Sequence, residues 1–222
     1  MYAGKLQQQS LALAFRNAER ALAGIQGLLR QRQIDMTTVD AFAFAAGPGA
    51  FTGLRVACAL AQGLAFGCDR PVIAVNSLRA LAHAAGASPG QRVLAAIDAR
   101  MGQVYWAVFE SGAPMRMLAP AALADPDQLA PLVRQWRPEV IAGNALQAYE
   151  SAWTGGTAPA QAGGPALLPQ ARADAAAVAE LACVDWGQGR MLPAREALPE
   201  YVRDRVALTL AQRRSAAAEA GR

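Results

Sequence analysis

A glycine-rich turn between a short apolar run and a helical pattern constrains this sequence more than any other feature. The turn Gly47-Pro48-Gly49 follows the apolar residues 39–46, and helical spacing then extends from Phe51 to Gly67. This order predicts a strand, a turn and a helix N-terminus, where free backbone N–H groups and the helix dipole favour an anion or a closely packed neighbour. We therefore expect a strand–turn–helix unit at this point.

The spacing of the glycines argues against the two standard nucleotide-binding motifs. Gly47, Gly49 and Gly53 are one residue too widely spaced for the dinucleotide fingerprint. No Lys-Ser or Lys-Thr pair follows to form a phosphate-cradling P-loop. Neither motif is expected here.

Strand and helix patterns alternate along the rest of the chain, which predicts an α/β fold. The expected strands are residues 41–46, 71–75, 93–97, 104–109 and 140–142, with a weaker one at 115–118. The expected helices are one ending near Gln33 and residues 51–66, 77–85, 126–136, 144–153 and 174–184, with a loop at 154–169. The break at residues 86–90 predicts an N-terminal lobe over 1–88, a C-terminal lobe over 89–204 and a helical tail over 205–222.

The first two predicted helices each carry a well-defined packing face. The first has an apolar stripe and the second a ridge of small residues four apart, which lets a neighbouring helix approach closely. Periodicity leaves two interpretations open: the faces cover their own sheet, or they contact a partner as a helix bundle. The residues are Leu11, Phe15, Ala18, Leu22, Ile25 and Leu29 in the stripe, and Gly53, Ala57, Ala61 and Ala65 in the ridge.

Composition and charge favour a globular intracellular protein. The 222 residues are 54% hydrophobic and 17% charged, which provides a sizeable core. The three cysteines form no C-x-x-C pair, so a reduced cytoplasmic setting is expected rather than a disulfide framework or a zinc site. No signal peptide and no apolar run as long as a membrane span is recognised. The net charge of +4 permits an acidic partner such as RNA, although the basic residues are scattered.

Four residues were considered for chemistry, and each fits a structural role better. His83 is the only histidine, and an isolated histidine lacks co-ligands. Asp98 ends an apolar strand, where a hairpin cap is the simpler role. Ser77 has no nucleophile elbow around it, and Cys58 has no adjacent base.

The turn and several later segments resemble the Gcp-like family, and specifically its small TsaB/YeaZ branch. The turn is Gly47 to Arg55, and the further segments occur in the family's order. They are residues 57–67, 71–78, 93–105 and 199–207. The resemblance therefore covers most of the chain from Val39 to Ala207.

This resemblance implies a two-lobe fold shared with actin, sugar kinases and Hsp70-type ATPases, a ribonuclease H-like α/β fold. It also implies a non-catalytic dimerization subunit, a scaffold for the catalytic subunit (TsaD) that makes N6-threonylcarbamoyladenosine (t6A) at adenosine 37 of tRNAs reading codons that begin with A. That catalytic subunit binds a metal through paired histidines, which the single His83 cannot provide.

The resemblance further implies the partners and cofactors. The implied partners are TsaD, the ATPase subunit (TsaE) and tRNA through the complex, with a homodimer as another assembly and no membrane. No cofactor or metal is expected on this chain alone, whereas the assembled complex uses ATP and a metal ion.

In the family the first two helices form the contact surface. We therefore favour the interpretation that the two helix faces bind a partner over the one in which they cover their own sheet. The implied interface residues are Leu11, Phe15, Leu22, Ile25, Leu29, Gly53, Leu54, Ala57 and Ala61. The residues that match the family's motif turn are Gly47, Pro48, Gly49, Phe51, Thr52, Gly53 and Arg55.

One departure from the family pattern concerns the start of the chain. Family members open with a strand carrying an Asp-Thr-Ser turn and then a hairpin, whereas this sequence starts at or just before the first helix. We therefore expect a truncated first lobe with little sheet. The absent turn is where the wider fold contacts nucleotide phosphate, so nucleotide binding by this chain alone is not expected.

Two other functions stay open on the sequence. A nucleotide-dependent phosphotransferase of the same fold would use Gly47 to Gly53 at its phosphate site and Asp98 as its acidic group. A stand-alone RNA-binding module is the least favoured, because the sequence lacks a dense basic patch with interleaved aromatic residues.

Overall fold

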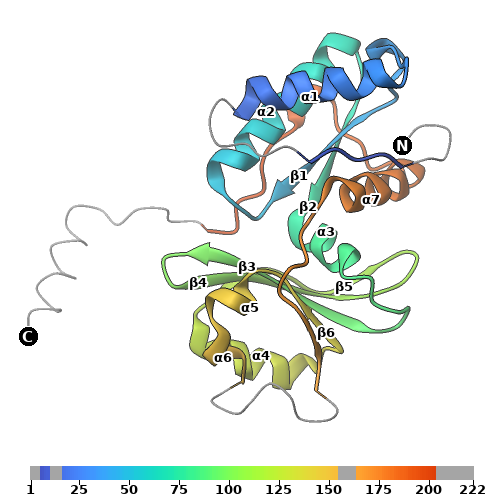
Figure 1. The fold of residues 1–222 in the computed structure, drawn as a ribbon. Helices are drawn as coiled ribbons and strands as arrows, with labels where there is room; N and C mark the ends of the chain where they lie inside the picture. Colours follow the sequence, from blue (N-terminus) through green and yellow to red (C-terminus); the bar gives the residue numbers. More distant parts are fainter. Residues whose placement is uncertain (1–5, 11–16, 155–163, 204–222) are drawn as a thin grey trace, which may run out of the picture.

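The chain forms two sheets with helices packed on them, seen as an upper and a lower part in Figure 1. The structure is a computed structural model and describes residues 6–10, 17–154 and 164–203. In the upper part lies a two-stranded sheet of order β1-β2, and in the lower part a five-stranded sheet of order β5-β4-β3-β6-β7. We call these parts the first and the second lobe.

The first lobe is built around two parallel strands, β1 (Phe42–Gly47) and β2 (Val72–Asn76). The helix between them, α2 (Phe51–Cys68), packs on β1 through a core of small and aromatic residues. Before β1 come α1 (Asn17–Gln31) and the 3₁₀ turn η1 (Met36–Thr38), and α1 lies beside α2 in Figure 1. After β2 comes α3 (Ser77–Ala84), whose N-terminus the Asn76 side chain caps through the amides of Leu78 and Arg79.

The second lobe begins with an antiparallel hairpin. Its strands are β3 (Arg92–Arg100) and β4 (Gln103–Glu110), and β5 (Arg116–Ala124) pairs with β4 on the far side. On the other edge of β3, two short parallel strands follow, β6 (Val140–Ala142) and β7 (Ala166–Leu168). The helical elements of this lobe are η2 (Pro126–Gln128), α4 (Leu129–Trp136), α5 (Ala145–Ala148) and α6 (Glu150–Thr154).

The end of the described chain returns to the first lobe. Helix α7 (Ala175–Gly187) packs against β2 and α3, and its Val178 and Leu181 share a buried cluster with Ile73 and Val75. The 3₁₀ turn η3 (Ala194–Glu196) lies against α2. Within the predicted C-terminal lobe, 89–204, α7 and η3 therefore pack with the first lobe, whereas Arg203 contacts the β3–β4 hairpin of the second.

Most predicted elements are confirmed, and three are corrected. Strand β5 is longer than the predicted 115–118, the predicted helix 144–153 is broken at Tyr149 into α5 and α6, and β7 lies inside the predicted loop 154–169. Pro120 and several alanines, which have low strand propensity, hid the strand character of β5. The interface residues Leu11 and Phe15 and the predicted tail 205–222 lie outside the described residues.

Candidate functional site

An open helical face on the first lobe is formed by α1 and α2, which lie side by side in Figure 1. On α1 the stripe residues Leu22, Ile25 and Leu29 are half-buried. A shallow groove runs between the start of α1 and the N-terminal half of α2. The α2 residues that line it are Phe51, Thr52, Arg55, Val56, Ala59 and Leu60.

The buried side of α2 corrects two predicted interface residues. Leu54 and Ala61 are 8% and 6% exposed, and Ala61 belongs to the core cluster that packs α2 on β1. A side chain enclosed by its own lobe has no surface left for a partner, so neither residue can form the contact face. Ala57 is half-buried against the same cluster, and Gly53 is exposed.

The outward side of α2 carries small residues of its own. Ala59 and Gly63 are exposed and lie one helical turn apart. A methyl group added at Gly63 would meet no atom within 4 Å. The predicted ridge of Gly53, Ala57, Ala61 and Ala65 therefore lies largely on the buried side of α2, and Ala59 and Gly63 are a separate pair on the outward side.

Helix α2 is long and apolar, which bears on the expectation that the chain has no membrane span. Among the described residues, this helix alone passes as a possible span by length and composition. Core helices of globular proteins also pass such a test, and 22% of the residues of α2 are fully buried in the structure while several others are half-buried. Helix α2 thus has more apolar surface than its own sheet covers.

The motif turn forms the junction between β1 and α2 and is held by a later segment of the chain. Gly47 has a φ of +128°, and a Cβ there would overlap the carbonyl oxygen of Glu200. The Glu200 amide donates to the Ala46 carbonyl at 2.7 Å. Only glycine allows this close approach, so the turn and the segment 197–203 are packed as one unit.

Segment 197–203 also joins the two lobes. In the first lobe, Tyr201 accepts a hydrogen bond from Arg55 Nε at 3.1 Å, and Glu200 accepts one from Asn76 Nδ2 at 2.8 Å. In the second lobe, Arg203 donates to Gln103 Oε1 at 2.8 Å. The segment therefore bridges the hairpin of one lobe and the motif turn of the other.

Between the lobes lies a cleft of about 330 Å³, bordered by the motif turn, the β3–β4 hairpin and segment 197–203. Asp98 lies in it, and its Oδ1 accepts hydrogen bonds from the Arg100 amide at 2.8 Å and the Tyr149 hydroxyl at 3.0 Å. Burial, with a further contribution from the Asp98 carboxylate, raises the pKa of Tyr149. Asp98 is thus engaged as the hairpin cap that the sequence predicted.

The other residues considered for chemistry also have structural partners. His83 Nε2 lies 2.7 Å from Glu180 Oε2 and links α3 to α7. Ser77 is buried at the start of α3. Burial raises the pKa of the Cys58 thiol, which donates to the Ala197 carbonyl at 3.4 Å. Within the described ranges, no group of three or more His, Cys, Asp or Glu side chains could hold a metal ion.

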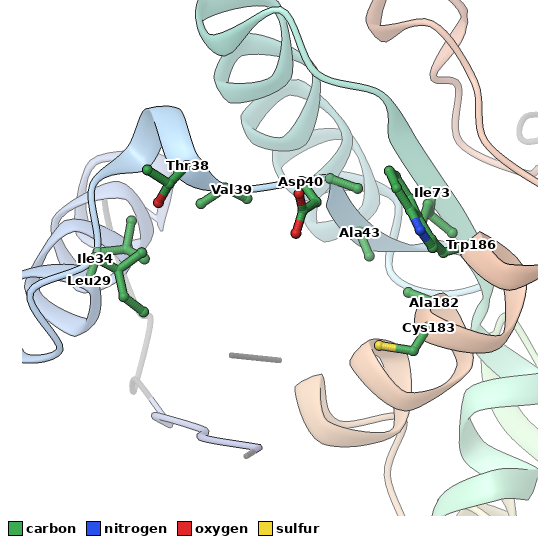
Figure 2. Close-up of a pocket in the computed structure, with 11 residues that line it drawn as sticks. Leu29, Ile34, Thr38, Val39, Asp40, Ala43, Ile73, Ala182, Cys183 and Trp186 are labelled. Carbon is green, nitrogen blue, oxygen red and sulfur yellow. The ribbon is translucent and has the colours of Figure 1, made fainter. Parts of the chain in front are cut away.

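A second concave surface, of about 300 Å³, lies on the first lobe between α1 and α7 (Figure 2). Leu29 and Ile34 line one side, Ala182, Cys183 and Trp186 the other, and β1 lies between them. The lining is mostly apolar and includes a single carboxylate, Asp40. The groove therefore brings together no acid–base or nucleophilic set.

The sequence did not identify three residues of the cleft, Asn144, Tyr201 and Arg203, nor Tyr149, which bonds to Asp98 there. Tyr201 and Arg203 lie in the family-like segment 199–207, but nothing local to them shows that they meet Arg55 and Gln103. Asn144 accepts from the Asp98 amide at 3.1 Å, and Tyr149 follows it by five residues. The resemblance of residues 93–105 and 199–207 to family segments was the one signal that pointed to this place.

Comparisons with known proteins agree with this architecture. Residues 13–152 match the family model described as "TsaD: tRNA N6-adenosine threonylcarbamoyltransferase". The chain is 33% identical over 198 residues to the tRNA threonylcarbamoyladenosine biosynthesis protein TsaB of Escherichia coli, covering 86% of this chain and 82% of that protein. It is 47% identical over 91 residues to the TsaB of Haemophilus influenzae, covering 40% of this chain and 39% of that protein.

A solved structure of a similar protein has the same fold. The structure described as YeaZ from Pseudomonas aeruginosa superposes with a TM-score of 0.77 at 33% identity, covering 90% of this chain and 91% of that one. The fold is thus the expected actin-like, ribonuclease H-like α/β fold. On its sequence, its fold and its relatives, the chain belongs to the TsaB/YeaZ family of Gcp-like proteins.

Proposed function

We propose that this chain acts in t6A formation on tRNA as a non-catalytic scaffold that binds the TsaD-type catalytic subunit. The observation that carries the proposal is the open face of α1 and α2, where an apolar helix exposes Ala59 and Gly63 to solvent. Small residues at helical spacing let a second pair of helices approach closely, and burying the apolar surface drives the association. The relatives named for threonylcarbamoyladenosine biosynthesis supply the pathway.

A structural role for the cleft supports the scaffold assignment. Asp98 caps its own hairpin, Cys58 is a buried thiol, and His83 is bonded to Glu180. Each of these groups is held by a contact within the chain: the Arg100 amide and Tyr149 hydroxyl at Asp98, the Ala197 carbonyl at Cys58, and Glu180 at His83. We accordingly assign the ATP and the metal ion of the reaction to the assembled complex rather than to this chain alone.

The remaining parts of the proposal follow the family. A TsaE-type ATPase would join the complex, tRNA would be bound through it, and the setting would be the cytoplasm. A homodimer formed through the same α1–α2 face would compete with the mixed complex, because both would bury the same surface. The contacts in the cleft do not favour the phosphotransferase alternative. Its required carboxylate, Asp98, is already bonded to Tyr149 and Arg100.

The test is reconstituted t6A formation on a tRNA transcript with two matched variants. Ala59→Arg places a long charged side chain on the proposed contact face, where overpacking and an unpaired buried charge would prevent docking. Ala84→Arg makes the same change at an exposed position of α3. We expect the first variant to lose at least tenfold in t6A formation and the second to retain wild-type activity.

Folding must be checked in parallel. Both variants should keep the circular dichroism spectrum and melting temperature of the wild type, since both positions are solvent-exposed in the chain. A folded Ala59→Arg variant with full t6A activity would refute the proposed contact face. Wild-type activity that is no higher than that of TsaD without this chain would refute the scaffold role itself.

A further inference from the structure

Three separate parts of the chain meet at the mouth of the interlobe cleft and form a surface of arginine and aromatic side chains. They are the motif turn with the start of α2, the β3–β4 hairpin and segment 197–203. We call this the cleft-mouth surface. Its members are Phe51, Arg55, Arg100, Met101, Tyr105, Tyr201 and Arg203.

Two arginines of this surface have no acidic partner among the described residues. Arg55 donates to the Tyr201 hydroxyl and lies 3.9 Å over the Phe51 ring. Arg203 donates to Gln103 Oε1 and to the Arg100 carbonyl, and lies 5.9 Å from the centre of the Tyr105 ring. Neutral partners fix the orientation of a guanidinium group while its full charge stays available to an anion.

The acidic groups nearby are already engaged. Asp98 lies 3.4 Å from Arg100 and accepts from Tyr149, and Glu200 accepts from Asn76. Each of these carboxylates has a donor of its own, so neither is used to neutralise Arg55 or Arg203. The cleft-mouth surface is therefore net positive by one charge, from three arginines and two carboxylates.

Large side chains beside these arginines are open to solvent. Phe51 is 45% exposed, Tyr201 48% and Met101 72%. The rings of Phe51 and Tyr201 lie 5.7 Å apart at an angle of 36°, so Arg55 contacts both. Fixed aromatic rings beside arginines offer stacking surfaces for nucleic-acid bases as well as charges for phosphates.

We propose that the cleft-mouth surface binds RNA, with Arg203 contacting a phosphate and Tyr201 stacking on an unpaired base. A protein partner with an acidic patch would use the arginines but would leave the paired rings of Phe51 and Tyr201 without a role. An RNA chain matches both the arginine charge and the exposed rings.

The inference deepens the proposed function and rests on it in one respect, the choice of tRNA as the RNA. It also explains why RNA binding was hard to predict from the sequence. Arg55 and Tyr201 lie 146 positions apart in the chain and Gln103 and Arg203 lie 100 apart, so these groups come together only in the folded protein.

The experiment measures the affinity of an unmodified tRNA transcript as a function of salt, for the mixed complex with TsaD and for this chain alone. Arg203→Gln removes one proposed phosphate contact, and Arg134→Gln makes the same charge change at an exposed position of α4. We expect Arg203→Gln to weaken binding several-fold at physiological salt and to reduce the salt slope by about 1. Arg134→Gln should change neither quantity.

A second pair of variants tests the stacking. Tyr201→Phe keeps the ring and should bind tRNA within about twofold of the wild type, whereas Tyr201→Leu should lose about tenfold, the effect of removing one stacked base. Equal affinities for these two variants would overturn the stacking role. An unchanged salt slope for Arg203→Gln, or an equal loss for Arg134→Gln, would overturn the surface as a whole.

The two proposals fail in distinguishable ways. If the mixed complex forms and the variants bind tRNA like the wild type, the RNA surface is wrong and the scaffold role stands. If no mixed complex forms, the scaffold role is wrong, and the tRNA affinities of the chain alone still decide the RNA surface.

Discussion

Two glycines fix the backbone on either side of the interlobe cleft. Gly47 is the last residue of β1 and Gly143 follows β6, with φ values of +128° and +121°. At Gly47 the neighbour is the Glu200 carbonyl, and at Gly143 it is the Ala96 carbonyl. Each glycine therefore lets a strand end pass close to another backbone, a packing requirement that a lone glycine in the sequence does not reveal.

Replacing Gly143 with alanine should destabilise the protein strongly. The new Cβ would overlap the Ala96 carbonyl oxygen and lie 2.8 Å from Leu81 Cδ2, at a φ that alanine rarely adopts. We expect a loss of more than about 2 kcal/mol in the free energy of unfolding, measured in urea. Gly63→Ala is the control, since its Cβ meets nothing and should add about 0.5–1 kcal/mol to the stability of α2. Equal stabilities of the two variants would contradict this account of Gly143.

Asp185 links three parts of the first lobe through charge. It is 3% exposed, accepts two hydrogen bonds from Arg79 at 2.8 and 3.0 Å, and is also bonded to Arg190. Burial alone would raise the pKa of Asp185, but the hydrogen bonds and charges of Arg79 and Arg190 outweigh it, and the pKa is lowered. Asp185→Asn would leave both arginines without their carboxylate and should cost about 3 kcal/mol.

The same ion cluster predicts a pH dependence with a definite sign. Because the pKa of Asp185 is lower in the folded chain, its contribution is fully present above the unfolded pKa of about 4 and is lost as pH falls through the folded pKa. The stability difference between the wild type and Asp185→Asn should therefore be constant from pH 7 to 5 and shrink below pH 4. Urea titrations across this range test it, and a difference that grows on acidification would contradict the assignment. Asp127→Asn, an exposed control, should change stability little.

At the scale of elements, Asn76 has two roles: it caps the N-terminus of α3 and it contacts the segment that borders the cleft. Asn76 Oδ1 accepts from the amides of Leu78 and Arg79, while its Nδ2 donates to Glu200 in segment 197–203. One side chain thus starts a helix in the first lobe and holds the segment that reaches the second. Loosening that contact should affect the segment more than the helix.

Two substitutions at Asn76 separate these effects. Asn76→Asp keeps a cap but removes the donor to Glu200 and places two carboxylates together, so hydrogen exchange should rise at the Glu200 amide with α3 still protected. Asn76→Ala removes both contacts and should also cost about 1 kcal/mol in the free energy of unfolding. Equal protection of residues 198–203 in the wild type and Asn76→Asp would show that the segment is held by other contacts.

The sequence predicted elements well where periodicity was strong and poorly where it was not. The hairpin of β3 and β4 and the helices α2 and α3 were expected within three residues of their ends. The short strand β7 was missed because its three residues carry no alternation and depend on pairing with β6. Leu54 and Ala61 were predicted on the contact face of α2, and both are buried. A ridge of small residues fits a core and a contact surface equally well, so the sequence could not distinguish the two faces.

At the scale of the whole molecule, segment 197–203 and α7 return the chain to its first lobe after the second is complete. This return encloses the cleft between Gly47 on one side and Arg203 on the other, and leaves the α1–α2 face open on the outside. The layout suits a subunit whose role is to bind other macromolecules. Sequence patterns could not show it, because it depends on contacts between residues more than 100 positions apart.

The most direct test of the scaffold role is the mass in solution, by size exclusion with light scattering, of this chain alone and mixed with the TsaD-type catalytic subunit of the same organism. The account predicts a mixed complex whose mass is the sum of the two subunits in an integral ratio, formed by the wild type and by Ala84→Arg but not by Ala59→Arg. Two separate peaks at the masses of the unmixed proteins, with the wild-type chain folded, would contradict it.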